Sequence, residues 1–113
     1  MASPTARSLA ALRQRGCLAA VVEHFNPHAR IRQDLFGAFD VLAIEPGQPG
    51  VLFVQCCVTG DITKRLAKLQ TEPVAERVRR VLAAGNRVSV HGWALRGARG
   101  KRKVYELKEV SVT

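Results

Sequence analysis

Cysteines and long apolar runs are both scarce in this sequence. It holds three cysteines, an odd number that includes the adjacent pair Cys56 and Cys57. Such a set is not a disulfide framework, which excludes a small disulfide-stabilised secreted fold and predicts a reducing compartment. The longest stretch without a charged residue, 46–60, contains proline and glycine and is shorter than the roughly 18 apolar residues of a membrane span. We therefore expect a cytoplasmic protein with no membrane partner.

Acidic and aromatic residues are also scarce. Eighteen Lys and Arg stand against nine Asp and Glu, which gives a formal net charge of +9, and the sequence pI is about 10.5. This balance favours a polyanionic partner, and we expect DNA. Only 5% of the residues are aromatic, too few for a stacking platform along a single strand. Duplex or branched DNA therefore fits better than single-stranded DNA.

Length and composition predict one folded domain over residues 1–113. A chain of 113 residues with 47% hydrophobic and 24% charged residues has the size and composition of a single globular unit. Ser3 followed by Pro4 is a helix start, while proline and glycine mark several later turns. The expected elements are a helix ending near Gly16, strands over 17–24, 39–44 and 51–57, helices over 61–68 and 73–84, and strands over 88–95 and 104–112. The order α-β-β-β-α-α-β-β predicts an α/β fold with a mixed central sheet flanked by helices.

Three polar positions stand out in the strands. Asp40 lies near the start of the strand 39–44, and Gln55 and Cys57 lie two residues apart in the otherwise apolar strand 51–57. The segment from Arg32 to Ile44, RQDLFGAFDVLAI, with VLFVQCC after it, resembles a small phage and bacterial branch of the PD-(D/E)XK nucleases. These nucleases have the restriction-endonuclease-like fold and include the Holliday-junction resolvases.

The resemblance implies a DNA endonuclease that uses Mg²⁺ or Mn²⁺. In that superfamily an acid at the start of the second strand, and an acid two residues before a lysine on the third, hold a divalent metal. Asp40 matches the first acid, whereas Gln55 and Cys57 stand in place of the second acid and the lysine. An amide oxygen can still bind Mg²⁺, whereas sulfur suits Zn²⁺ better.

Other residues are candidates to complete such a site. Glu23 and Asp34 could add negative charge and join Asp40 and Gln55 as metal ligands. Lys64, at the start of the helix 61–68, could replace the missing strand lysine. The catalytic candidates are therefore Asp40, Gln55, Cys57 and Lys64.

Each of these residues also has a structural alternative. Asp40 could cap a turn, Gln55 could hydrogen-bond within the sheet, and Cys57 could be a buried apolar residue like Cys56. We interpret His24 and His28 as surface residues near phosphate, because Pro27 between them argues against a metal-binding helix. In the segment 34–37 we expect Phe36 to pack in the core with Phe39. A Cys57 nucleophile is the weakest alternative, since no activating base accompanies it.

The basic residues divide into groups that could contact phosphate. No acid occurs from position 87 to 103, and further cations lie before Asp40 and on the helix 61–68. The nucleic-acid-binding candidates are Arg30, Arg32, Lys64, Arg65, Lys68, Arg87, Arg96, Arg99, Lys101, Arg102 and Lys103. Phosphate contacts of this kind are independent of sequence and sensitive to salt.

Two functions from different classes follow. The first is a compact nuclease in which Asp40 and a divalent metal support phosphodiester hydrolysis on duplex or branched DNA. The second keeps the fold but makes the protein a non-catalytic DNA-binding or interaction module, consistent with the residues at positions 55 and 57. The resemblance to resolvases also implies a homodimer.

Overall fold

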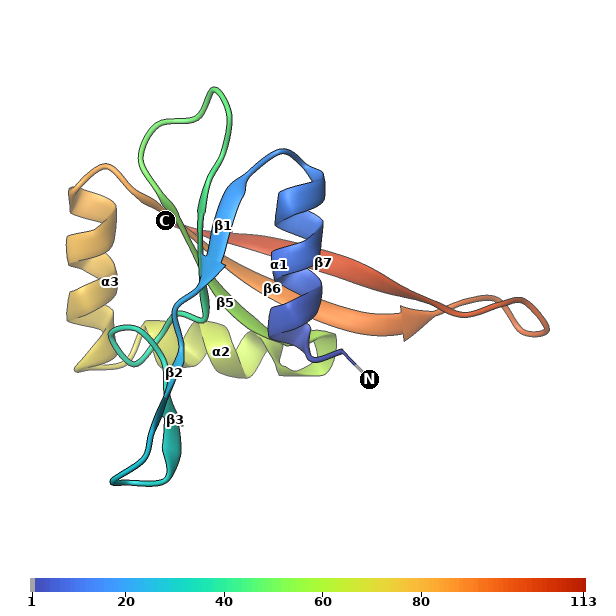
Figure 1. Ribbon diagram of the computed structural model, residues 1–113, viewed down its shortest axis with the longest axis horizontal. Helices are drawn as coiled ribbons and strands as arrows, with labels where there is room; N and C mark the ends of the chain where they lie inside the picture. Colours follow the sequence, from blue (N-terminus) through green and yellow to red (C-terminus); the bar gives the residue numbers. More distant parts are fainter. Residues whose placement is uncertain (1) are drawn as a thin grey trace.

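The computed structural model describes residues 2–113 and contains three α-helices and seven strands within them (Figure 1). In chain order the elements are α1 (Pro4–Gln14), β1 (Leu18–Val21), β2 (His24–Asn26), β3 (Ile31–Gln33), β4 (Val41–Ile44), β5 (Leu52–Val58), the short 3₁₀ turn η1 (Thr59–Asp61), α2 (Ile62–Leu69), α3 (Val74–Ala83), β6 (Arg87–Arg96) and β7 (Val104–Val112). No helix within residues 2–113 is long and apolar enough to cross a membrane.

Five strands form one mixed sheet in the order β1-β4-β5-β6-β7. Strands β1, β4 and β5 pair antiparallel, β5 and β6 pair parallel, and β6 and β7 pair antiparallel. The parallel pair needs a crossover connection, and α2 and α3 provide it. The predicted mixed sheet with flanking helices is confirmed. The predicted element order was incomplete, because β2 and β3 form a separate two-stranded hairpin between β1 and β4.

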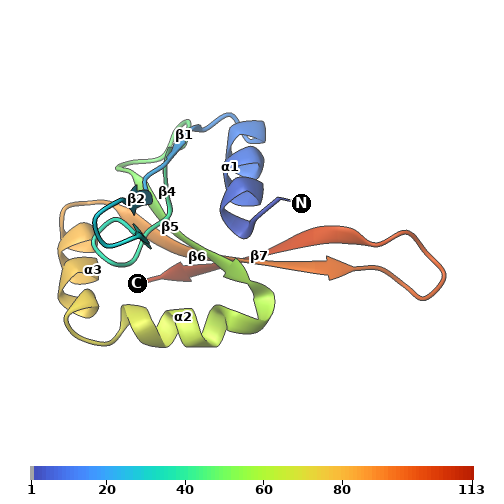
Figure 2. The ribbon, with the colours of Figure 1, turned by 60° about the horizontal axis from the view of Figure 1, so that its bottom comes forward.

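Helices cover both faces of the sheet, α1 on one side and α2 and α3 on the other (Figure 2). Side chains alternate between faces along β5. Phe53 and Cys57 join the apolar cluster under α2 and α3, whereas Val54 and Cys56 join the cluster under α1. Gln55 therefore shares the face of Phe53 and Cys57, and it is 1% exposed.

Local sequence signals explain how the helices are placed. The Ser3 hydroxyl accepts a hydrogen bond from the backbone N–H of Ala6, as expected of a helix cap. Asp61 precedes α2 but makes no such bond. The start of α2 is fixed by packing instead, because a side chain at Gly92 would overlap Ile62 and the Thr59 backbone. Glycine at position 92 therefore lets α2 lie close against β6.

The hairpin of β6 and β7 extends well beyond the helices (Figures 1 and 2). Strand β5 pairs with β6 only as far as Trp93, so the last residues of β6 pair with β7 alone. The loop at its tip, residues 97–103, is exposed throughout and carries Arg99, Lys101, Arg102 and Lys103. This hairpin holds a cluster of positive charge away from the body of the protein.

Candidate metal centre

Asp40 is fixed immediately before β4 and against β5. Its backbone N–H donates to the Val54 carbonyl at 2.9 Å. Its Oδ2 accepts two hydrogen bonds, one from Gln55 Nε2 at 2.9 Å and one from the backbone N–H of Cys56 at 2.8 Å. The carboxyl group is thus oriented by two neighbours on β5, which leaves its other oxygen for further ligands. The expected convergence of Asp40 and Gln55 from neighbouring strands is present.

Two further carboxylates join Asp40. Ligand oxygens of Glu23, Asp34 and Asp40 lie within 4.8 Å of one another, so the three groups could hold a metal ion. The β2–β3 hairpin explains this proximity, because it begins after Glu23 and ends before Asp34, and its first register pair is His24 with Gln33. We call these three residues and Gln55 the acidic cluster.

Burial and crowding of carboxyl groups set the charge of Asp40. Its side chain is buried, and loss of solvation raises its pKa to about 7. The N–H of Cys56 opposes this shift, while Asp34 and Glu23 add to it, Asp34 partly through a side-chain hydrogen bond. Asp40 therefore changes charge near neutral pH, and a cation placed among the three carboxylates would favour its ionised form.

In the described part of the chain, the nitrogen of the Gln55 amide is hydrogen-bonded, whereas its oxygen is not. Its Nε2 donates to Asp40, but its buried Oε1 has no hydrogen-bond partner within residues 2–113. Such an atom is costly unless a ligand or water meets it. Carboxylate and amide oxygens are the ligands that Mg²⁺ and Mn²⁺ prefer, so the acidic cluster fits a hard divalent cation.

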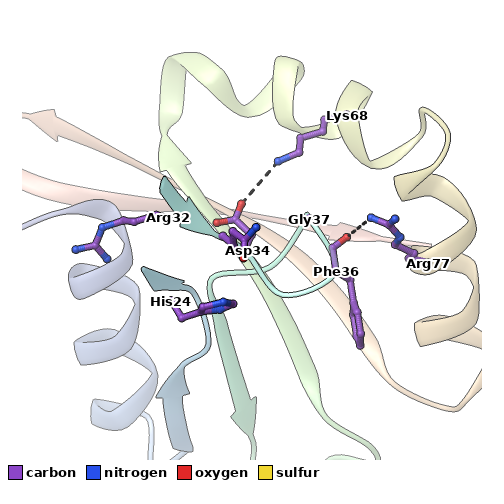
Figure 3. Close-up of a pocket in the computed structure, with 8 residues that line it drawn as sticks. His24, Arg32, Asp34, Phe36, Gly37, Lys68 and Arg77 are labelled. Carbon is purple, nitrogen blue, oxygen red and sulfur yellow. Dashed lines mark hydrogen bonds and ion pairs between the residues drawn. The ribbon is translucent and has the colours of Figure 1, made fainter. Parts of the chain in front are cut away.

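Cationic side chains lie next to two carboxylates of the acidic cluster, and Figure 3 shows Lys68 directed at Asp34. Lys68 Nζ lies 3.7 Å from Asp34 Oδ2, and Arg32 Nη1 lies 3.4 Å from Glu23 Oε1. Lys68 and Arg32 line a hollow beside the cluster together with Arg77, whose Nη1 donates to the Phe36 carbonyl at 3.0 Å. The hollow presents positive charge beside the carboxylates, as a phosphate-binding surface requires.

Cys57 and Lys64 occupy other surroundings. Cys57 lies in the apolar cluster under α2 and α3, where burial raises the pKa of its thiol. Cys56 packs on the opposite face, where burial raises its pKa to about 12. Both cysteines therefore fit the alternative of buried apolar residues. Lys64 is exposed, while Lys68, one turn later on α2, pairs with the cluster.

The other predicted phosphate contacts differ in position. Arg30 lies in the exposed turn of the β2–β3 hairpin, and Arg65 is half-buried on α2. Arg87 begins β6 and donates to Glu45 Oε1 at 2.7 Å, so a structural ion pair accounts for it. Arg96 and the loop residues 99–103 extend from the protein on the long hairpin.

The structure corrects one core assignment and adds residues to the site. Phe39 is fully buried, as expected, but Phe36 is 48% exposed with a φ of +58°, so the prediction of a core position for Phe36 is wrong. From the sequence, Lys68 was expected among the phosphate contacts and not beside the carboxylates, and Arg77 had no predicted role at the site. The i to i+4 spacing of Lys64 and Lys68 on one helix face was the available signal for Lys68.

Comparison with known proteins supplies no relative: the chain matches no protein-family model, no curated protein and no solved structure.

Proposed function

We propose that this protein is a divalent-metal-dependent endonuclease of the restriction-endonuclease-like fold that acts on DNA. The observation that carries the proposal is the acidic cluster: three carboxylates within 4.8 Å of one another beside a buried, unpartnered amide oxygen. A buried carboxyl group with a raised pKa, as Asp40 has, is typical of functional sites. Cations of the adjoining hollow provide a place for phosphate.

The order of the elements supports the proposed restriction-endonuclease-like fold. An N-terminal helix is followed by three antiparallel strands, β1, β4 and β5, then by helices that cross over to β6, parallel to β5. The resemblance implies a core with Asp40 at the start of one strand and Gln55 on the next. The β2–β3 hairpin is then an insertion that delivers Asp34 to the site.

The protein groups at this site have separable roles. Asp40, Glu23 and Asp34 would hold the metal, with Gln55 Oε1 as a further oxygen ligand. When bound, Mg²⁺ supplies an activated water and neutralises charge on the phosphate. Cys56 and Gln55 orient Asp40 through hydrogen bonds to Oδ2.

The cations beside the metal ligands act on the phosphate. Lys68 presents an ammonium group beside Asp34, where it would stabilise negative charge on a phosphate near the cluster. Arg32 lines the same hollow and would bind a neighbouring phosphate.

The proposal is tested by incubating supercoiled, linear and four-way-junction DNA with Mg²⁺ or Mn²⁺. We expect cleavage by the parent protein and a loss on the order of 10³-fold in Asp40→Asn, since metal catalysis contributes several kcal/mol. Asp61→Asn is the matched control, because it removes the same charge outside the acidic cluster. Equal cleavage by the parent and Asp40→Asn would remove Asp40 from the mechanism.

A non-catalytic DNA-binding module is the second candidate. Its support is that β5 offers Gln55 and the buried Cys57 where the resemblance leads one to expect an acid and a lysine. It predicts DNA binding that weakens steeply with salt, needs no metal and is unchanged in Asp40→Asn. Metal-dependent cleavage that Asp40→Asn abolishes would eliminate it.

A further inference from the structure

A second hollow adjoins the hollow beside the acidic cluster. The two hollows share Phe36 and Arg77, which line both. The second has a volume of about 460 Å³, within the range of pockets that hold small organic groups. Its remaining lining residues come from β5, α3 and the turn after α3: Phe53, Arg80, Val81, Ala84 and Asn86. We call this hollow the Phe36 slot.

The Phe36 slot is apolar inside and basic at its rim. Phe53 and Val81, both nearly buried, belong to the core under α2 and α3 and form its apolar wall. Arg77 and Arg80 are exposed, and Arg77 makes no ion pair within residues 2–113. A flat apolar ligand that carries negative charge at its edge matches this combination.

Phe36 is held in place by its backbone. The Arg77 guanidinium donates to its carbonyl, and Leu35 and Phe39 bridge the turn on either side of it. Its φ of +58° is uncommon for a bulky residue, yet its ring is 48% exposed instead of buried. Figure 3 shows the ring pointing away from Asp34. The aromatic surface is therefore exposed at the second hollow, on the side away from Asp34.

From this geometry we infer that the Phe36 slot accepts one unpaired base of a DNA strand whose phosphates lie on Lys68 and Arg77. The inference rests on the proposed function and narrows its substrate to DNA with an unpaired base, as in a gap, flap or junction. A paired base within a duplex cannot present its face to the ring, whereas an unpaired base can stack on it.

The Phe36 slot offers little that would distinguish one base from another. Among the described residues, the one amide side chain that lines the Phe36 slot, Asn86, already makes hydrogen bonds within the protein. Its Oδ1 accepts from the Val51 N–H at 3.0 Å, and its Nδ2 donates to the Val81 carbonyl at 3.1 Å. Stacking alone does not distinguish bases strongly. We expect binding that tolerates any unpaired base.

The test measures binding to two labelled DNAs in EDTA, so that no strand is cut: an intact duplex and the same duplex with a short central gap. We expect the parent to prefer the gapped DNA about tenfold, the size of one base–aromatic stack. Phe36→Leu keeps an apolar side chain but removes the ring, and should abolish the preference. Phe36→Tyr should retain it.

Phe25→Leu is the matched control, because Phe25 is 56% exposed on β2 and lines neither hollow. It should keep the tenfold preference. A preference that survives in Phe36→Leu, or a parent that binds both DNAs equally, would overturn the inference and leave the proposed nuclease standing. A parent that binds neither DNA would overturn the proposed function itself.

Discussion

The protein contains two polar clusters on opposite faces of one sheet, each built around two buried side chains, and they differ in how completely those buried groups are paired. The acidic cluster lies on the face of α2 and α3, with three carboxylates and an unsatisfied amide oxygen. The second cluster lies under α1 and joins His91, Ser8, Trp93, Glu109 and Arg15. We call it the histidine cluster.

Side-chain hydrogen bonds link all five residues of the histidine cluster. Trp93 Nε1 donates to Ser8 Oγ at 2.9 Å, Ser8 Oγ lies 3.0 Å from His91 Nδ1, and His91 Nε2 lies 2.8 Å from Glu109 Oε2. Arg15 donates to both oxygens of Glu109. The bonds from His91 and Arg15 lower the pKa of Glu109 to about 2. A serine, a histidine and a carboxylate in a row are the groups of a nucleophilic triad, but Ser8 and His91 are fully buried and closed to a substrate.

The comparison distinguishes a cluster with a structural role from a cluster that is a candidate binding site. The hydrogen bonds of the histidine cluster join α1 to β6 and β7, and its central groups, Ser8 and His91, are fully buried and paired. The acidic cluster instead brings like charges together and could hold a cation. The difference predicts opposite responses to removal of one carboxylate from each cluster.

The largest expected effect is a gain of stability in Asp40→Asn. In metal-free buffer at pH 8 the substitution removes a buried charge, while an amide oxygen can still accept from Gln55 and Cys56. A shift of the Asp40 pKa from 3.8 to about 7 corresponds to a free energy of unfolding higher by up to about 4 kcal/mol. Urea denaturation of the parent and the variant measures this difference in the free energy of unfolding. A less stable variant would show that Asp40 is structural.

Glu109→Gln is the matched change in the histidine cluster and should act in the opposite direction. It weakens the bonds to His91 and Arg15, and we expect a loss of about 1–2 kcal/mol, reduced by the partial exposure of Glu109. Cleavage should stay within about twofold of the parent, because this cluster faces away from the acidic one. A loss of cleavage at unchanged stability would contradict the separation of the two faces.

The pH dependence of stability should show both clusters. Because the folded-state pKa of Asp40 is raised, its contribution to stability falls as pH rises from about 4 to about 7. Because that of Glu109 is lowered, its contribution is lost as pH falls from about 4.5 towards 2. Thermal unfolding across this range should give a maximum near pH 4–5. In Asp40→Asn the decline towards pH 7 should shrink, and an unchanged decline would contradict the assignment.

The smallest expected effect is that of Lys68→Ala. Lys68 is partly exposed and its ion pair with Asp34 is long, so stability should change by less than about 0.5 kcal/mol. Loss of one phosphate contact should reduce the slope of log affinity for duplex DNA against log salt by about one. Lys108→Ala is the control, because Lys108 is an exposed lysine on β7 outside the candidate phosphate contacts. Equal slopes for parent and Lys68→Ala would remove Lys68 from the phosphate surface.

Local patterns predicted the main elements of the sheet and helices, because apolar spacing and Pro/Gly turns mark each of them. The β2–β3 hairpin was missed since its strands are three residues long and its apolar residues, Phe25 and Ile31, are exposed. Glu23 and Asp34 were candidates because of their charge alone. Their proximity depends on the hairpin that lies between them, and no local sequence pattern indicated it. Exposure of Phe36 depends on a positive φ, which the sequence around Gly37 did not reveal.

The central claim is that the acidic cluster binds a divalent cation and the histidine cluster does not. Titration calorimetry with Mn²⁺ at pH 8 tests it directly on the parent, Asp40→Asn and Glu109→Gln. We predict that the parent and Glu109→Gln bind Mn²⁺ with the same affinity and that Asp40→Asn loses the binding. Equal Mn²⁺ affinity in the parent and Asp40→Asn, or no binding by the parent, would contradict the claim.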